Sequence, residues 1–254
     1  MIRSYKAYKT LPASIRSVLA GLENLPGASI LGVVPIEDQK TTKIFKDHDC
    51  RVVHTAVPDI TRQANAGFAA ADTEFVQVFD SDDIMYPNMS TSCFYTGGTP
   101  EAVKGWGLEG IRQDIADVIY TDYEMWSGKD FLQPVQCIGV LNELDVRCFI
   151  PELCVFRREP WVKLGGFDET LWRYAQWDYF LRLRNNGGRF MRLPFFGFRY
   201  VLSDQQLSRR IDKGEFNAVD DPAWEKFRAK HGGMPNAVTV GHGARMRQME
   251  DVVT

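Results

Sequence analysis

Three carboxylates follow an apolar run closely enough to act together on one cation. The stretch 74–88 reads EFVQVFDSDDIMYPN, in which the apolar run ends at Asp80, Asp82 and Asp83, before a turn at Pro87. Magnesium binds oxygen ligands and is usually held by one or two carboxylates together with the phosphates of a substrate. A D-x-D turn fits such a site, whereas an acidic turn that caps the next helix would use the same residues for structure alone. The residues by themselves favour neither interpretation.

The segments before this turn alternate between strand and helix patterns. Apolar residues recur at helical spacing in 11–25, and an Ala-rich helical stretch begins with Asp59 or Thr61 as its N-cap. Short apolar strands separated by helices predict βαβ units, and therefore a parallel sheet with helices on both faces. The predicted strands are 1–5, 28–34, 50–55 and 73–79, and the predicted helices are 11–25, 38–49 and 59–72.

The predicted sheet gives the acidic turn a meaningful location. In open parallel sheets, ligands bind outside the carboxyl ends of the strands. Asp80 and Asp82 follow the last predicted strand, so they would stand at such an end. Location as well as composition therefore favours a binding site.

The second half of the chain differs in composition. Residues 88–117 contain the Gly and Pro of a loop, whereas aromatic and Arg residues become dense later, with an amphipathic stretch at 174–184. Residues 221–231 have the pattern of a polar helix. No linker divides the chain cleanly, so we expect one domain over 1–213 and a C-terminal helix and tail over 214–254.

Composition excludes several classes of protein. A net charge of −3 gives no general attraction to nucleic acid or to an anionic membrane. The five cysteines form no CxxC pair, which argues against a zinc site and fits reduced thiols, so we expect a cytoplasmic protein. The apolar runs are far shorter than the about 20 residues that cross a bilayer, so no transmembrane segment is expected.

Two separated stretches carry a resemblance to a known family. AGFAAADTEFVQVFDSDDIMYPN and, about 75 residues later, FRREPWVKLGGFDETLWRYAQWDYFLRL resemble a family 2 glycosyltransferase of the GT-A fold, over most of residues 1–210. The resemblance implies an α/β, Rossmann-like fold with a mostly parallel central sheet, a nucleotide-sugar-binding half at 1–95 and an acceptor-side half at 96–213. It implies metal-dependent transfer of one sugar, with inversion, from a UDP- or GDP-sugar to the hydroxyl of an unidentified acceptor.

Within this resemblance, the D-x-D element binds the metal and the nucleotide-sugar. Asp80 would contact the ribose or the sugar and share the metal. Asp82 would coordinate Mn²⁺ or Mg²⁺, and Asp83 would support the turn or cap a helix.

The family often adds a late His as a further metal ligand. The matching region 200–210, YVLSDQQLSRR, has no His. Ser203 and Asp204 fall nearest to that position, and the Asp204 carboxylate is an adequate metal ligand. Arg209 and Arg210 would neutralise the diphosphate.

The resemblance also places residues around the nucleotide. Arg62 and Asn65 lie in TRQANAGFAAA, which resembles a family helix beside the nucleotide. The acidic residue that reads the base would be Glu37 or Asp38, because Pro35 occupies the usual Asp position.

Two further turns, after the first predicted strand and at GGFDE, complete the predicted donor site. The first predicted strand is short, and Arg3 and Tyr5 would form the turn beside the nucleotide, with Lys6 in place of the usual Asn. The glycines of GGFDE, Gly165 and Gly166, would let the backbone approach the donor sugar closely.

The expected catalytic base is missing from its place. Inverting members carry an E-D-x-D element whose first Asp deprotonates the acceptor, and Gln176 stands there in YAQWDY. An amide cannot accept a proton at neutral pH. Asp178, Asp168 and Glu169 are the other carboxylates that could act, with Asp178 preferred.

Aromatic residues near GGFDE allow two interpretations. Trp172 and Tyr174 are the candidates for stacking against an acceptor sugar. Trp177 and Phe180 stand at helical spacing, which favours core packing.

Two alternatives remain beside an active transferase. A nucleotide-sugar-binding protein with impaired catalysis fits Gln176 and the missing His. A sugar nucleotidyltransferase would need a Gly-rich phosphate loop near the N-terminus, and MIRSYKAYKTLP contains no glycine.

Overall fold

Two β-sheets, flanked by helices, make up the part of the chain that the structure describes. The structure, a computed structural model, describes residues 1–23, 25–95, 116–202 and 222–232. One sheet has four strands in the order β3-β2-β1-β5, and the other contains β4-β9-β7-β10-β6, with β8 paired to β7.

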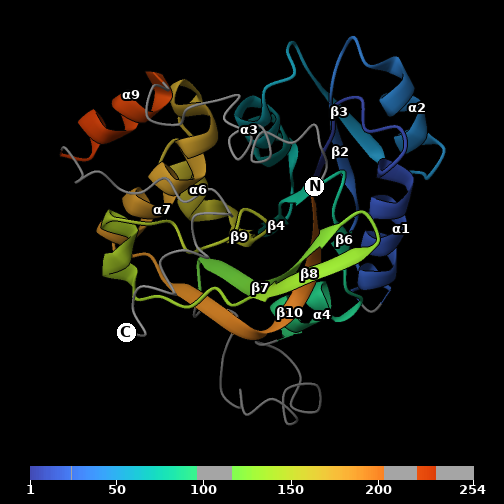
Figure 1. The fold of residues 1–254 in the computed structure, drawn as a ribbon. Helices are drawn as coiled ribbons and strands as arrows, with labels where there is room; N and C mark the ends of the chain where they lie inside the picture. Colours follow the sequence, from blue (N-terminus) through green and yellow to red (C-terminus); the bar gives the residue numbers. More distant parts are fainter. Residues whose placement is uncertain (24, 96–115, 203–221, 233–254) are drawn as a thin grey trace.

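The four-stranded sheet is parallel and comes from the first 80 residues. Its crossover helices α1 and α2 lie on one face and α3 lies on the other, as Figure 1 shows. The predicted parallel sheet with helices on both faces is therefore confirmed in this half. Its elements are β1 (Ile2–Arg3), α1 (Leu11–Leu22), β2 (Leu31–Pro35), α2 (Gln39–Lys46), β3 (Arg51–Thr55), α3 (Ile60–Ala70) and β5 (Phe79–Asp80).

Side-chain caps fix where two of these helices begin. The Asp38 carboxylate accepts a hydrogen bond from the Thr41 amide at 3.1 Å and starts α2. The Asp59 carboxylate accepts one from the Arg62 amide at 2.8 Å and starts α3. Both caps satisfy amide groups that a helix terminus otherwise leaves unpaired.

The predicted strand 73–79 divides between the two sheets. Its first part, β4 (Phe75–Gln77), pairs antiparallel with β9 (Val155–Arg157), whereas β5 pairs parallel with β1. Between them the Val78 amide donates to the Cys154 carbonyl at 3.0 Å. The single predicted strand is therefore a crossing point that joins both sheets just before the acidic turn.

The second sheet is mixed. The long strand β10 (Phe190–Leu202) pairs parallel with β7 (Val118–Ser127) and antiparallel with β6 (Ile84–Met85). The expectation of a mostly parallel sheet therefore does not extend to this half. Here the pairings of β6, β4, β8 and β9 with their neighbours are antiparallel, and β10 with β7 is parallel. The remaining elements are α4 (Asn88–Tyr95), β8 (Asp130–Val135), η2 (Leu141–Asp145), α6 (Arg158–Lys163), η3 (Glu169–Tyr174), α7 (Ala175–Asn185) and α9 (Pro222–Lys230).

A buried aromatic cluster joins α3 to the elements of the second half. Phe68 on α3 stacks on Trp161 with ring centroids 4.8 Å apart and meets Phe167 edge-on at 5.4 Å. Phe156 stacks on Phe180 of α7. Because these side chains are buried, their packing holds the two halves together and fixes the GGFDE turn beside α3.

The C-terminal helix α9 packs on the second half near η3 and α7 (Figure 1). Phe227 lies 4.8 Å from Trp177 and 5.6 Å from Tyr174 between ring centroids. The predicted packing role of Trp177 and Phe180 is confirmed, since both are buried. Among the described helices, none combines the length and apolarity needed to cross a membrane.

Candidate functional site

Arg3 and Asp80 meet at the carboxyl ends of adjacent parallel strands. They are register partners at the last positions of β1 and β5. The Arg3 Nε donates to Asp80 Oδ1 and Nη2 donates to Oδ2, each at 2.9 Å. Burial would lower the pKa of Arg3, but Asp80 and Glu152 raise it above its ordinary value, so the buried guanidinium stays charged. The fold thus brings together two residues that the sequence predicts near a nucleotide.

The other two carboxylates of the turn have different environments. Asp83 is fully buried, and its Oδ1 accepts a hydrogen bond from the Val201 amide of β10 at 2.9 Å. Burial and the charges of Asp82 and Asp80 raise its pKa well above the ordinary value. Asp82 is half-buried. Asp83 therefore ties the turn to the second sheet, which leaves Asp80 and Asp82 as the partly exposed carboxylates.

These two carboxylates fit a cation that a substrate helps to bind. Asp80 gives both oxygens to Arg3, but a carboxylate offers about four lone-pair sites, so it retains acceptor capacity. Within the described ranges, no cluster of three or more His, Cys, Asp or Glu side chains could hold a metal unaided. Magnesium commonly needs only one or two carboxylates and completes its shell with phosphate oxygens and water. Asp204, Arg209 and Arg210 lie outside the described residues.

Asp38 is committed to structure, whereas Glu37 is exposed. The Asp38 carboxylate accepts hydrogen bonds from the Lys6 amide at 2.6 Å and the Tyr8 hydroxyl at 3.1 Å, besides those from Thr41. Burial alone would raise the pKa of Asp38, but these hydrogen bonds lower it. Asp38 thus joins the turns after β1 and β2, and the contact of Glu37 with a nucleotide base stays a prediction.

Tyr5 and Lys6 lie at the exposed end of β1. Tyr5 is 39% exposed, and the Lys6 ammonium lies 4.8 Å from its ring centroid. Lys6 has a φ of 54°, in the left-handed region. Asn adopts this region more readily than Lys, which gives a physical reason for the Asn that the resemblance leads one to expect there.

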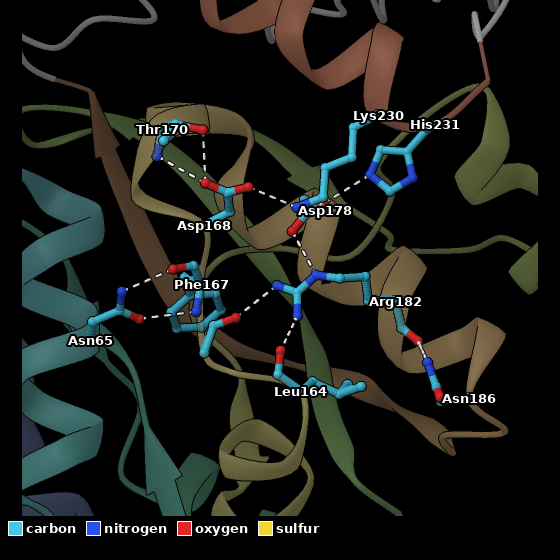
Figure 2. Close-up of polar contacts among 11 residues, drawn as sticks. Asn65, Leu164, Phe167, Asp168, Thr170, Asp178, Arg182, Asn186, Lys230 and His231 are labelled. Carbon is cyan, nitrogen blue, oxygen red and sulfur yellow. Dashed lines mark hydrogen bonds and ion pairs between the residues drawn. The ribbon is translucent and has the colours of Figure 1, made fainter.

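Asn65 on α3 is bound to the GGFDE turn. Its amide donates to the Phe167 carbonyl at 2.9 Å and accepts from the Phe167 amide at 3.0 Å, as Figure 2 shows. Its Nδ2 also lies 3.0 Å from Glu169, and Arg62 contacts Glu169 at 3.4 Å. Asn65 and Arg62 therefore connect the two halves of the fold at this turn.

The glycines of GGFDE are required by backbone geometry. Gly165 and Gly166 have φ values of 76° and 75°. A Cβ at Gly166 would lie 2.8 Å from the Trp161 ring and 3.1 Å from the Asn65 side chain. The close approach at Gly166 is thus to Trp161 and Asn65, and the prediction that these glycines lie against a sugar stays a prediction.

Arg182 links the WDYFLRL segment to the same turn. Its guanidinium donates to the carbonyls of Leu164 and Gly166, both at 2.7 Å, and to Asp178 at 2.8 Å (Figure 2). Arg182, which belongs to the second stretch of the family resemblance, therefore fixes the backbone of the GGFDE turn.

Asp178 is enclosed by two cationic side chains and a His ring. It is fully buried, and its carboxylate meets Arg182, the His231 ring at 2.9 Å and the Lys230 ammonium at 2.9 Å. Burial would raise the pKa of Asp178, but His231, Lys230 and Arg182 lower it. For Asp178 to deprotonate an acceptor, α9 would have to withdraw Lys230 and His231 from it.

Asp168, like Asp178, is paired with a cationic side chain of α9. Its carboxylate pairs with Lys230 at 2.7 Å and accepts two hydrogen bonds from Thr170. Burial would raise its pKa, but Lys230 and Thr170 lower it to about 2. Lys230 thus bridges Asp168 and Asp178 and holds α9 against the GGFDE turn.

A pocket opens beside Arg3, between the nucleotide-side sheet and α7. Its lining includes Arg3, Thr61, Glu152, Trp172 and Gln176. Trp172 has a φ of 45°, and its carbonyl accepts a hydrogen bond from Thr61 at 2.9 Å. Strained residues of this kind cluster at functional sites. The contact of Trp172 with an acceptor stays a prediction, whereas Tyr174 is buried under α9 and cannot contact an acceptor there.

Glu152 is the pocket residue that the sequence does not reveal. Its Oε2 lies 3.2 Å from Arg3 Nη2 across 149 positions of sequence. The available signal was weak: one carboxylate within the otherwise mostly apolar stretch FIPELCVF. Only the pairing of β4 with β9 brings this stretch beside the acidic turn.

A larger cavity lies at the opposite ends of the strands. It has a volume of about 460 Å³, and Met1, Ile30 and Phe75 are among its lining residues. These residues are at or near the amino ends of their strands. Ligands of open parallel sheets bind at the carboxyl ends, so the turn at Asp80 and Asp82 remains the candidate site, and the small pocket of about 10 Å³ that Arg3 lines is next to it.

Comparison with known proteins yields matches in structure alone. No protein-family description matches the sequence, and no curated protein sequence does. The structure of S. aureus TarS 1–349 in complex with UDP-GlcNAc matches with a TM-score of 0.61 and 11% identity, over 98% of this chain and 87% of that one. The same fragment in complex with UDP matches with a TM-score of 0.57 and 14% identity, over 91% and 69%.

A second enzyme gives the same result. Glucosyl-3-phosphoglycerate synthase from Mycobacterium tuberculosis, in complex with UDP, matches with a TM-score of 0.59 and 13% identity, over 93% of this chain and 80% of that one. Identities this low establish architecture only. The chain has the GT-A fold, as its sequence predicts.

Proposed function

We propose that this protein is a glycosyltransferase that moves one sugar from a nucleotide-diphosphate sugar to an acceptor hydroxyl. The observation that carries the proposal is the position of Asp80 and Asp82 at the carboxyl end of β5, where Asp80 pairs with Arg3 of β1 and Arg3 lines a small pocket. Two proteins of the same fold form complexes with UDP or UDP-GlcNAc, which supports a uridine nucleotide as the donor.

The residues of the turn have distinct parts in this proposal. Asp80 and Asp82 would hold Mn²⁺ or Mg²⁺, which supplies positive charge to the departing diphosphate when it is bound. Arg3 fixes the Asp80 carboxylate through two hydrogen bonds. Asp83 anchors the turn to β10. Glu37 and Tyr5 are exposed at the adjacent strand ends, where the nucleotide base would lie.

The proposed reaction is a direct displacement with inversion at the anomeric carbon. A carboxylate of the acceptor side takes the hydroxyl proton while the new glycosidic bond forms and the diphosphate leaves. The acceptor class and the oligomeric state stay open.

Nucleotide release tests the proposal. The protein is incubated with Mn²⁺ and, separately, with UDP-glucose, UDP-GlcNAc and GDP-mannose, and free nucleotide is measured with water as the acceptor. We expect release from one donor, and a loss of at least about 100-fold in Asp82→Ala if its carboxylate acts on the diphosphate. Asp130→Ala, which removes an exposed carboxylate of β8, is the matched control and should leave the rate unchanged.

A nucleotide-sugar-binding protein without transfer activity is the second candidate. Gln176 in place of the base and Asp178 enclosed beneath α9 favour it. Calorimetric binding of UDP with no nucleotide release from any donor would support this candidate over the transferase. Equal rates and equal UDP affinity in Asp82→Ala and the wild type would contradict the assignment of the site itself.

A further inference from the structure

Glu152 is a carboxylate of the pocket that has no part in binding the donor as proposed. Its Oε2 lies 3.2 Å from Arg3 Nη2, and the same nitrogen lies 2.9 Å from Asp80 Oδ2. The two carboxylates therefore contact the same guanidinium nitrogen. Glu152 precedes β9 in the acceptor-side half, whereas Arg3 and Asp80 belong to the nucleotide-side half. It thus lies where donor and acceptor would meet.

Exposure separates Glu152 from most other carboxylates nearby. Its side chain is 43% exposed, compared with 28% for Asp80 and 0% for Asp178. Asp83 is also fully buried. An acceptor hydroxyl must touch the group that deprotonates it, and Asp83 and Asp178 cannot be touched as they stand.

Glu169 is comparably exposed but is differently placed. Its oxygens contact Asn65 at 3.0 Å and Arg62 at 3.4 Å, and it is not among the residues that line the pocket. Glu152 uses only Oε2 to contact Arg3. Among the described residues, none donates a hydrogen bond to its Oε1. That oxygen is available to accept a proton.

Gln176 supports Glu152 directly. Its Nε2 donates to the Glu152 carbonyl at 2.9 Å and lies 3.4 Å from the Pro151 carbonyl. Both side chains line the same pocket. Gln176 stands where the family resemblance predicts a catalytic base. Its amide therefore holds the backbone of Glu152 in place.

We propose that Glu152 is the general base of this chain, with Gln176 and Arg3 as positioning residues. The inference rests on the proposed transferase function. Glu152 Oε1 takes the proton of the acceptor hydroxyl as that oxygen forms a bond to the anomeric carbon. The bond from the anomeric carbon to the diphosphate oxygen breaks, and its electron pair leaves with the nucleotide diphosphate. The protonated Glu152 then returns its proton to water.

Glu152→Gln tests this role because it removes the base and keeps the size and one oxygen acceptor of the side chain. The readouts are steady-state nucleotide release from the active donor, with water as the acceptor, and calorimetric binding of UDP. We expect kcat to fall about 100-fold or more, while UDP affinity and the donor KM stay within about threefold of the wild type. Glu143→Gln, which removes another arginine-paired carboxylate, is the control and should retain the wild-type rate.

A second variant separates a catalytic from a merely structural role. Gln176→Asp in the Glu152→Gln background returns a carboxylate to the pocket, and we expect it to recover at least tenfold in kcat. A structural role for Glu152 would instead lower UDP affinity or thermal stability in Glu152→Gln, with no recovery from Gln176→Asp.

The outcomes distinguish this inference from the function on which it rests. A wild-type rate in Glu152→Gln overturns the role of Glu152 and leaves the transferase standing. A wild-type protein that neither binds UDP nor releases nucleotide from any donor overturns both.

Discussion

Arg3 is the residue on which the geometry of the candidate site depends most. It is 6% exposed, yet its guanidinium reaches two carboxylates that come from different halves of the chain. Leaving Asp80 and Glu152 without this cation would place two negative charges close together in a partly buried setting, which costs free energy. Arg3 therefore sets the spacing between the proposed donor and acceptor carboxylates.

For single residues, the sequence predicts their place along a strand better than their contacts with distant residues. The predicted strand end was enough to place Asp80 and Asp82 at the carboxyl end of a parallel strand. The pairing of Arg3 with Asp80 depends on the register of β1 and β5, and the contact with Glu152 spans 149 positions. Neither is encoded in local spacing, so only the fold reveals them.

Lys6 offers a prediction about backbone strain. Its φ of 54° is costly for a Lys but not for a Gly, and its amide hydrogen bond to Asp38 does not depend on the side chain. We expect Lys6→Gly to raise the Tm by about 1–3 °C in a thermal melt. Lys9→Gly, at an exposed position without a positive φ, should lower it slightly. A lower Tm for Lys6→Gly than for Lys9→Gly would contradict the strain argument.

At the scale of elements, the GGFDE turn is held from three directions. Asn65 of α3, Arg182 of α7 and Lys230 of α9 each bind it through hydrogen bonds or an ion pair. The sequence predicts the helices around this turn well, because their apolar periodicity is strong. It does not predict that α9 would cover Asp178, because the contact of His231 and Lys230 with that residue comes from tertiary packing.

Substitution of the two glycines tests how tightly the turn is packed. Gly166→Ala should destabilise the protein by about 2–3 kcal/mol, because strain at positive φ adds to a contact of the new Cβ with the Trp161 ring. Gly165→Ala meets open space and should cost only about 1 kcal/mol. Urea denaturation measures both. Equal losses would show that the contact with Trp161 contributes nothing.

The ion pairs of α9 predict a response to acid. The pKa of Asp168 is lowered to about 2, and that of Asp178 is also lowered, whereas an unfolded Asp titrates near 3.9. Their stabilising contribution is therefore complete above about pH 4 and is lost as the pH falls towards 2. We expect tryptophan fluorescence, to which Trp224 contributes from its packing on Tyr174 and Trp177, to change over this range.

Lys230→Met provides the matched variant for this titration. It should lower stability at neutral pH and reduce the further loss between pH 4 and pH 2, because the Asp168 pKa returns towards its ordinary value. An acid response identical to that of the wild type would mean that Lys230 does not anchor α9.

At the scale of the whole molecule, the two sheets are interlocked. The nucleotide-side half supplies β4 and β6 to the second sheet, and β5 of the first sheet follows directly from β4. The alternation of strands and helices was sufficient to predict the parallel sheet of this half. The mixed sheet was not predictable, because its order depends on pairings between strands more than 70 positions apart.

The division into halves predicted at residue 95 therefore does not coincide with a boundary between the two sheets. The acidic turn lies where β5 of one sheet passes to β6 of the other. Glu152, from the second half, contacts Arg3 of the first. A donor bound at Asp80 would contact residues from both halves.

A crystal structure of the protein with UDP and Mn²⁺ tests this account most directly. We predict an anomalous manganese peak against the Asp82 carboxylate and the diphosphate, at the carboxyl ends of β1 and β5, with Glu152 facing the position that the sugar would occupy. UDP bound elsewhere, such as in the cavity at the amino ends of the strands, or bound at this turn with no manganese beside Asp82, would contradict it.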